Sequence, residues 1–399
     1  MTAPLTPGFS FRTLANDGHA RTGALTTPHG EVPTPTFMPV GTQGSVKGLS
    51  PREVAETGAR VVLGNTYHLW LRPGPELIAE LGGLHRFARW DGAMLTDSGG
   101  FQAFSLAQQG PRTKASTVTA GAIVSEEGVV FRSHLDGSKR AMTPEESMRI
   151  QGLIGADVAM QLDECPPLGG EGVRDRAAIE RAVARTTRWG HRCLRVWRQE
   201  HRPRGRALFG IVQGGTFTDL RIEHAQELAA IDDGFDGLAL GGFSVGEPIE
   251  MMYAALADVA HRLDPDRPRY LMGVGTPPDL LEGIEHGIDM FDCVLPTRNA
   301  RNGQALTRFG KVNIKQARHR SDPRPLDEAC GCECCRGGYS RAYLRHLFMA
   351  GEMLVLRLLS VHNLFTYGAL MRDARAAIEG QRYAAFKRAW LEAYAAGEA

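Results

Sequence analysis

Eight short apolar runs, most of them followed by an amphipathic stretch, limit how this chain can fold more than any other feature. The runs lie at 33–41, 60–69, 93–101, 157–164, 207–215, 237–244, 269–276 and 290–298. Their apolar residues are nearly continuous, which is typical of strands buried on both faces of a parallel sheet. Helices are expected at 175–200, 217–231, 247–262 and 277–287. Eight strands separated by helices predict an α/β fold, a closed (β/α)8 TIM barrel, with an open doubly wound sheet as the alternative.

Polar side chains and glycines stand at the ends of these runs. The carboxyl ends of barrel strands meet at one rim, which is where catalytic groups of such barrels lie. The residues at these ends are Asn65, His68, Asp97, Asp163, Gln213, Gly241, Gly242, Gly275 and Asp292. Three carboxylates and an amide are therefore expected at one rim, although each alone has a structural reading as a strand-end cap or a satisfied amide.

Such a set fits a planar heterocycle attached to a sugar. Asp163 can accept from the N1–H and N2–H₂ donors of guanine, while Gln213 and the Gly241–Gly242 amides can donate to its O6. Asp97 and Asp292 are then available for a glycosidic bond, where one carboxylate attacks the anomeric carbon and another group moves protons. Spacing alone leaves both carboxylates as candidates for the attacking group.

A cysteine-rich segment, CGCECC, predicts a metal site. Cys330, Cys332 and Cys335 with His362 downstream make a complete tetrahedral shell of three thiolates and one imidazole, which predicts one structural zinc ion per chain. Cys334 offers an alternative shell of four cysteines, but four ligands within six residues would strain the backbone.

Charge is balanced over the whole chain, with 46 Lys and Arg against 45 Asp and Glu. Residues 298–345 nevertheless carry eleven Lys or Arg and four Asp or Glu. This local excess predicts a phosphate-binding patch, and a solvated charged face is the alternative. The absence of a long apolar run and of a secretory start predicts a cytoplasmic protein without a membrane partner.

The expected organisation follows from these segments. Residues 1–302 are expected to form the barrel, with an inserted hairpin near 103–142. Residues 303–370 are expected to form a zinc-binding subdomain, opened by a second hairpin and closed by a return helix. The tail, 371–399, is expected to be a C-terminal amphipathic helix, at 371–396.

From about residue 8 to 370 the chain resembles the bacterial tRNA-guanine transglycosylases, also called queuine tRNA-ribosyltransferases. The matching motifs are LGNTYHL, LTDSGGFQ, DECPP, FGIVQGG, GGFSVGEP, YLMGVGTP, FDCVLPTRNARNG, the Cys-x-Cys-x₂-Cys site and VHN. The resemblance implies a glycosyltransferase of queuosine biosynthesis that exchanges the guanine at the tRNA wobble position for prequeuosine-1 (7-aminomethyl-7-deazaguanine). It also implies a homodimer, and tRNAs of the Asp, Asn, His and Tyr type as partners.

The same resemblance assigns roles to residues. Asp292 is similar to the family nucleophile, which forms a covalent intermediate with ribose, and Asp97 to its general acid/base. Base recognition is implied for Asp163, Gln213, Gly242, Phe101, Met272 and Cys165. Contacts to the tRNA are expected from Arg298, Arg301 and Asn65, and the zinc shell matches Cys330, Cys332, Cys335 and His362.

Two other functions are considered. A zinc-dependent barrel hydrolase or deaminase needs several histidines at strand ends, and only His68 stands at one. A non-catalytic RNA-binding subunit is expected to lack the catalytic carboxylates, yet Asp97 and Asp292 are both present.

Overall fold

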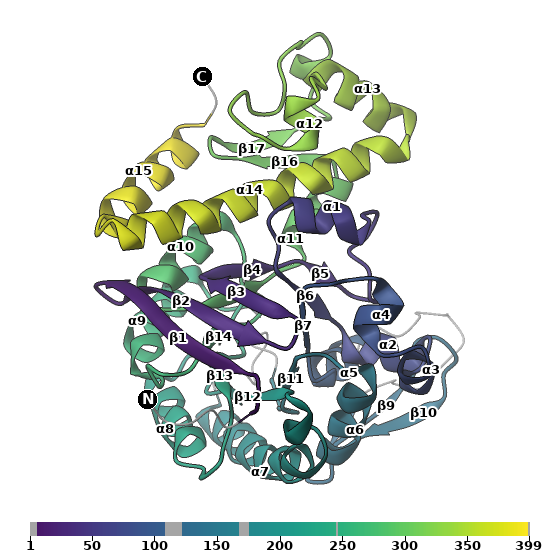
Figure 1. Ribbon diagram of the computed structural model, residues 1–399, viewed down its shortest axis with the longest axis vertical. Coiled ribbons are helices and arrows are strands. Elements are labelled where there is room, and N and C mark those ends of the chain that lie inside the picture. The colour runs from purple at the N-terminus through teal and green to yellow at the C-terminus, as the bar shows by residue number, and fades with distance from the viewer. Residues whose placement is uncertain (1–5, 108–121, 167–174, 245, 398–399) are drawn as a thin grey trace.

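The computed structural model describes residues 6–107, 122–166, 175–244 and 246–397. Its main sheet is a closed ring of parallel strands, so the predicted (β/α)8 barrel is confirmed (Figure 1). The strands are β4 Thr36–Met38, β5 Val40–Gly41, β6 Val61–Gly64, β7 Ala93–Thr96, β11 Val158–Met160, β12 Ala207–Val212, β13 Gly237–Leu240, β14 Arg269–Leu271 and β15 Met290–Asp292. β4 and β5 are halves of one strand interrupted at Pro39; β4 pairs with β15 and β5 pairs with β6, which closes the ring.

Helices surround this ring in chain order. They are α1 Pro51–Glu56, α2 Thr66–Leu71, α3 Pro75–Glu80, α4 Leu84–Ala88, α5 Gly100–Ala107, α6 Pro144–Ile154, α7 Arg176–Glu200, α8 Thr218–Ala229, α9 Ile249–Val259 and α10 Pro277–Glu285. The four helices expected from the sequence correspond to α7–α10 and are confirmed. Thr276 caps α10 through a reciprocal capping box with Asp279, as its sequence indicates.

Three apolar runs change from strand to helix earlier than expected. The run 60–69 is a strand only to Gly64, because the Asn65 side chain accepts from the His68 N–H and starts α2. In the same way, β7 gives way to α5 at Gly100, and β15 gives way to α11 (Leu295–Arg301). The candidate site residues Asn65, Asp97 and Asp292 therefore lie at junctions between a strand and a following helix.

An antiparallel sheet near the N-terminus, which the sequence did not reveal, covers the N-terminal end of the barrel. It consists of β1 Ser10–Asp17, β2 Ala20–Thr27 and β3 Gly30–Thr34. Leu25 and Val32 of this sheet share a hydrophobic core with Val158 and Phe209 inside the barrel. Two contacts connect the same sheet to the starts of barrel strands: an ion pair between Arg21 and Asp289, and a hydrogen bond between His29, in the turn from β2 to β3, and Asp157.

The insertion after the third barrel strand is a three-stranded sheet. It contains β8 Ile123–Val124, β9 Val129–Arg132 and β10 Lys139–Met142, in the order β10-β9-β8. Of the hairpin expected at 103–142, residues 103–107 belong to α5, and 108–121 lie outside the described residues.

A smaller lobe follows β15 (Figure 1). It contains the expected hairpin, β16 Gln304–Thr307 and β17 Gly310–Asn313, then α12 Glu333–Arg336 and α13 Arg341–Ala350. The long α14, Met353–Glu379, returns between this lobe and the barrel, where it contacts α1, α10 and β4. α14 thus takes the place of the barrel's eighth helix, and the lobe is an insertion before it.

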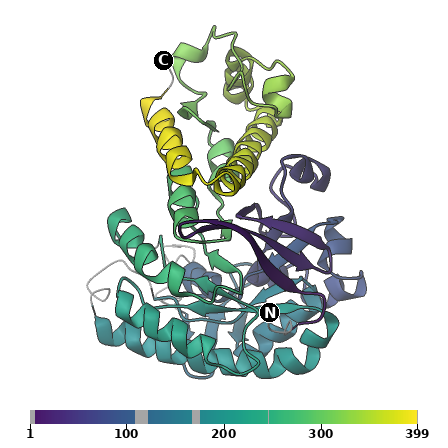
Figure 2. The same ribbon diagram turned by 60° about the vertical axis from the view of Figure 1, so that its left-hand side comes forward.

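The single helix expected over 371–396 is wrong. Residues 371–379 continue α14, and α15, Tyr383–Ala396, is a separate helix that lies at an angle to it (Figure 2). The break has a local cause, because Gly380 ends α14 and Gln381 adopts a left-handed φ of 51°.

Among the described residues, α14 is the one helix long and apolar enough by length and composition to cross a membrane. More than half of that apolar stretch, 56%, is buried inside the protein, as in the core helix of a globular domain.

Candidate active site and metal centre

Asp97 follows β7, and its carboxylate is held by residues at the neighbouring junction between β6 and α2. Its Oδ1 accepts a hydrogen bond from the Thr66 N–H (2.8 Å), and its Oδ2 accepts one from the Asn65 amide. The Thr66 hydroxyl also donates to the Asp97 carbonyl (2.6 Å). Asp97 is therefore fixed in place by the start of α2, and Asn65 is the residue that both caps this helix and holds the carboxylate.

Asp292, at the end of β15, is held through one oxygen only. Its Oδ1 accepts from the Tyr270 hydroxyl (2.5 Å) and from the Gly273 N–H (2.7 Å). Within the described part of the chain, no hydrogen bond to Oδ2 is found. A carboxylate with one oxygen fixed and the other unengaged is oriented for attack on an electrophilic carbon.

Asp97 lies close enough to Asp292 for the charge of Asp292 to act on it. Burial raises the pKa of Asp97 to about 7; the Thr66 N–H opposes this shift and the nearby charge of Asp292 adds to it. Burial also raises the pKa of Asp292, against the hydrogen bonds from Tyr270 and Gly273. Asp97 can thus carry a proton near neutral pH, as a general acid requires.

The loops that follow β11, β12 and β13 bring together a set of hydrogen-bond donors and acceptors. The Gln213 side chain donates to Asp163 Oδ2 (2.7 Å), and the Ser98 hydroxyl lies 3.4 Å from Asp163 Oδ1. Burial raises the pKa of Asp163 to about 6, against these two hydrogen bonds. Gly242 packs directly on the Gln213 amide, because a Cβ there would stand 2.5 Å from its Oε1. Ser98 is the residue after Asp97, so the group of Asp163, Gln213 and Gly242 lies next to Asp97.

The remaining residues expected around a base, Cys165, Met272 and Phe101, lie just beyond the ends of β11, β14 and β7. Cys165 follows Asp163 and contacts Gln213, and burial raises the pKa of its thiol to about 12, so it is neutral. Met272 directly follows β14 and packs against the barrel interior. Phe101, in the first turn of α5, is 46% exposed.

Two of the expected RNA contacts lie on α11, the helix that follows Asp292. Arg298 and Arg301 both lie on α11, where Arg298 is exposed and Arg301 is half-buried. The Arg301 Nη1 is buried without a hydrogen-bond partner among the described residues. Burial and the neighbouring Arg298 both lower the pKa of Arg301.

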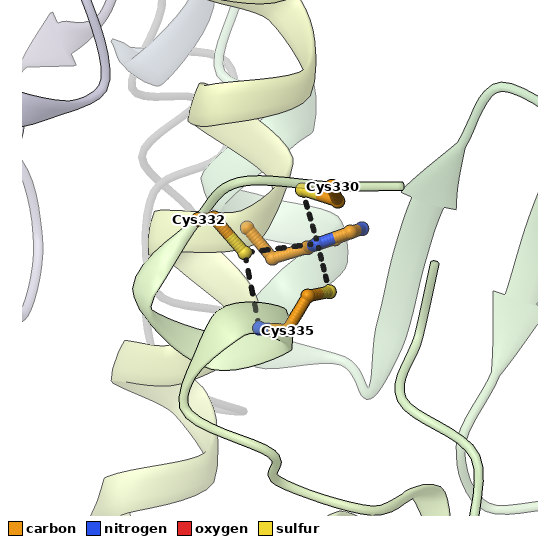
Figure 3. A group of neighbouring side chains, drawn as sticks. Cys330, Cys332 and Cys335 are labelled. Atoms are coloured by element: carbon orange, nitrogen blue, oxygen red, sulfur yellow. Dashed lines mark hydrogen bonds between the residues drawn. The ribbon is translucent and has the colours of Figure 1, made fainter. Parts of the chain in front are cut away.

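The four predicted metal ligands come together in the smaller lobe. The sulfurs of Cys330, Cys332 and Cys335 lie 3.6, 3.4 and 3.4 Å from the Nδ1 of His362 (Figure 3). All four ligand atoms lie within 4.8 Å of one another. The His362 Nε2 is 3.1 Å from the Leu306 carbonyl, a contact that directs Nδ1 toward the sulfurs. This cluster could hold a metal ion, and Cys334 is buried outside it.

The neighbouring Asn363 connects this cluster with the barrel rim. Its Oδ1 accepts from the Leu306 N–H (2.7 Å), and its amide donates to the carbonyls of Pro296 (2.8 Å) and Gln304 (3.0 Å). Pro296 belongs to α11, the helix that carries Arg298 and Arg301.

Sequence reasoning missed Tyr270, which supports Asp292 from the adjacent strand. Tyr270 is the second residue of the apolar run RYLMGVGT, where a buried aromatic residue is ordinary. The signal that could have indicated it is its phenol oxygen, since a buried hydroxyl needs a partner. Overall, the barrel and the carboxylates at its carboxyl-end rim define a (β/α)8-barrel enzyme.

Comparison with known proteins narrows this class. The model of the queuine tRNA-ribosyltransferase family matches residues 17–396. A queuine tRNA-ribosyltransferase of Sorangium cellulosum is 66% identical, over 98% of this chain and 94% of its own. Relatives of the same name from Solidesulfovibrio magneticus and Cereibacter sphaeroides are 54% and 52% identical, covering 98–99% of this chain and 99% of their own. The chain belongs to the queuine tRNA-ribosyltransferase family, and it is a glycosyltransferase.

Proposed function

We propose that this protein exchanges the guanine at the wobble position of tRNA for prequeuosine-1 through a covalent bond between Asp292 and ribose. The observation that carries the proposal is the asymmetric hold on Asp292, whose Oδ1 is fixed by two donors while Oδ2 is unengaged among the described residues. Family membership supports the reaction class, and the pairing of Asp292 with Asp97 supports the route.

In the first half of the reaction, Asp292 Oδ2 attacks ribose C1′ and the bond between C1′ and guanine N9 breaks. The electron pair leaves with guanine, and protonated Asp97 delivers a proton to the departing base. In the second half, Asp97 takes a proton from prequeuosine-1, whose N9 attacks C1′ and releases the Asp292 carboxylate. One glycosidic bond replaces another, so the exchange needs no nucleotide cofactor.

The base is proposed to lie between Phe101 and Met272. Asp163 accepts from its N1–H and N2–H₂ groups. Gln213 uses one amide hydrogen on Asp163, which leaves the second for O6 of the base. The Gly242 N–H donates to the same oxygen, and Cys165 lines the pocket as a neutral thiol.

The tRNA is proposed to bind along α11 and the basic segment 298–345. Arg298 and Arg301 are the expected contacts next to the exchanged base. Asn65 is proposed to reach the RNA with the amide hydrogen that Asp97 does not use. Phosphate contacts would offset the cost of taking the wobble base out of its stack. The proposed substrates are tRNAs of the Asp, Asn, His and Tyr type.

Zinc is the metal proposed for the Cys330, Cys332, Cys335 and His362 cluster. Three sulfurs and one imidazole form a closed tetrahedral donor set, which suits a structural zinc ion rather than a catalytic one. When bound, the metal supplies a cross-link between the lobe and α14.

A cytoplasmic location is also proposed, in keeping with thiolates that must stay reduced. The proposed oligomeric state is a homodimer.

The test is incorporation of labelled guanine into unmodified tRNA, with and without prequeuosine-1. Asp292→Asn is expected to abolish both incorporation and a denaturant-resistant adduct between protein and RNA. Asp258→Asn, on the exposed side of α9, is the matched control and is expected to retain both activities. Exchange by Asp292→Asn at the wild-type rate would refute the assignment.

A further inference from the structure

Arg221, in the first turn of α8, carries a charge in an unusual environment. Its side chain is fully buried, at 0% exposure. No carboxylate among the described residues lies within ion-pair distance of its guanidinium. Burial lowers the pKa of Arg221 to about 9, and the charge of Glu247 opposes this shift from beyond ion-pair distance. A buried charge without a directly paired counter-ion is costly, and it is retained where polar groups around it are arranged to receive it.

Backbone carbonyls take the place of the counter-ion. The Arg221 Nε donates to the Gly215 carbonyl (2.7 Å), and its two terminal nitrogens lie 3.4 Å from the carbonyls of Val212 and Gly242. The guanidinium also lies over the Phe243 ring, 3.7 Å from its centroid. Arg221 thus connects the carboxyl ends of β12 and β13 by hydrogen bonds to backbone carbonyls at both ends.

These two strand ends carry the groups proposed to read the base. Gln213 directly follows β12, and Gly242 lies two residues beyond β13. The Gly242 carbonyl is turned toward Arg221, and its φ of 68° requires a residue that tolerates the left-handed region. Its N–H has no acceptor among the described residues, so this donor is available to a ligand.

The loop between Gln213 and α8 is closed tightly over the same arginine. A Cβ on Gly214 would stand 2.6 Å from the Arg221 Cγ and 2.9 Å from its backbone nitrogen. Position 214 therefore has no space for a side chain while Arg221 remains in place, so the chain after Gln213 runs directly against Arg221.

We infer that Arg221 is a positioning residue for base recognition, which fixes the ends of β12 and β13 so that Gln213 and the Gly242 N–H converge on the exocyclic carbonyl oxygen, O6, of a guanine-like base. The inference rests on the proposed function, and it adds Arg221 as a residue that determines the affinity for the base. Arg221 lies beneath the pocket and takes no proton in the exchange.

The experiment measures KM for guanine and KM for tRNA separately, in the guanine-exchange assay with the full-length, metal-loaded protein. Arg221→Lys keeps the charge but loses the planar fork that spans three carbonyls. We expect it to raise KM for guanine about tenfold and to leave KM for tRNA within about twofold. Phe243→Leu removes the ring beneath the guanidinium and is expected to raise KM for guanine about threefold.

Arg202→Lys is the matched control, because Arg202 is also a buried arginine but lies at the opposite end of β12, where it pairs with Asp233 and Asp236. It is expected to lower the thermal midpoint and leave both KM values unchanged.

Two results would overturn the inference: a guanine KM for Arg221→Lys within about twofold of wild type, or an equal rise in both KM values. If Arg221→Lys does not fold, Phe243→Leu decides, and an unchanged guanine KM in that variant overturns the inference. Failure of the proposed function is a different outcome, since the wild-type protein itself would then incorporate no guanine.

Discussion

Tyr270 and Asp292 lie on adjacent parallel strands, and the Tyr270 hydroxyl donates a 2.5 Å hydrogen bond to Asp292 Oδ1. The tyrosine ring is buried inside the barrel, so the bond is made from the hydrophobic side of the carboxylate. The same bond lowers the pKa of Asp292 against the effect of burial. Tyr270 therefore helps to keep the proposed nucleophile ionised as well as oriented.

We predict that Tyr270→Phe slows formation of the protein–RNA adduct about tenfold. Without the hydroxyl, the pKa of Asp292 rises further, so the acid limb of the pH–rate profile should move to higher pH. Single-turnover adduct formation across pH measures both effects. Tyr383→Phe, which removes a hydroxyl bonded to the Leu281 carbonyl, is the control and should leave the profile in place. An unmoved profile in Tyr270→Phe would contradict this role.

The pKa of Asp97 predicts how guanine release depends on pH. Because the pKa of folded Asp97 is raised to about 7 from an ordinary value near 4, the acid form persists through this window and is lost above pH 7. Guanine release should fall as the pH rises through about 7. In Asp97→Asn the release should be slow at all pH values, and the fall should be absent. Retention of the fall in that variant would assign it to another group.

The same shift has a consequence for stability. Folded Asp97 binds a proton that the unfolded chain has already lost between about pH 4 and 7, so its contribution to the free energy of unfolding decreases across this range. Thermal unfolding measured at both ends of the range, for wild type and Asp97→Asn, gives the size of this contribution.

At the opposite end of the barrel, the contribution of Asp157 to the free energy of unfolding is expected to be lost in acid. Burial raises the pKa of Asp157, but hydrogen bonds from His85, His29 and the Met94 N–H outweigh it and hold the pKa below its usual value. Stability from Asp157 should thus be present above about pH 4 and be lost as the pH falls through its lowered pKa. Asp157→Asn should cost about 2–4 kcal/mol at pH 7 and flatten this acid loss. Asp232→Asn, at an exposed position, should change neither value.

Metal removal should destabilise the smaller lobe without directly displacing Asp97 and Asp292. Chelation or Cys335→Ser should lower the thermal midpoint and tRNA affinity, since the His362–Asn363 pair connects the cluster with α11. Cys334→Ala should keep a full equivalent of metal, because Cys334 lies outside the ligand group. Elemental analysis of both variants tests the assignment, and equal metal loss in the two would contradict it.

Salt dependence should identify the RNA contacts. If Arg298 contacts a phosphate, Arg298→Ala should reduce the slope of log affinity against log salt by about 0.9. Arg204→Ala, also exposed but in the short helix just before β12, should leave the slope unchanged. Equal slopes for wild type and Arg298→Ala would remove this contact from the proposal.

The sequence was most informative about the barrel strands, because strands buried on both faces leave nearly continuous apolar runs. It also indicated the carboxylates, since the rule that strand ends share one rim places Asp97, Asp163 and Asp292 together without knowledge of their contacts. The metal cluster was predictable because cysteine spacing encodes its geometry locally.

Other features could not be read in this way. The pairing of His29 and His85 with Asp157 joins residues 128 and 72 positions apart, and no local pattern indicates it. Arg221 sits on an ordinary helical stretch, and its role depends on carbonyls whose direction is fixed only by tertiary structure. The break at Gly380 was missed because the apolar periodicity continues on both sides of it.

The order of the strands around the barrel divides the rim into two sectors. Asp163, Gln213 and Gly242 follow the ends of the consecutive strands β11, β12 and β13, whereas Tyr270 and Asp292 lie on β14 and β15. If the proposed roles hold, substitutions in the first sector can therefore change which heterocycle is accepted without disturbing Asp292, the proposed nucleophile. A barrel built in this way can evolve a new base preference while the surroundings of the proposed nucleophile stay intact.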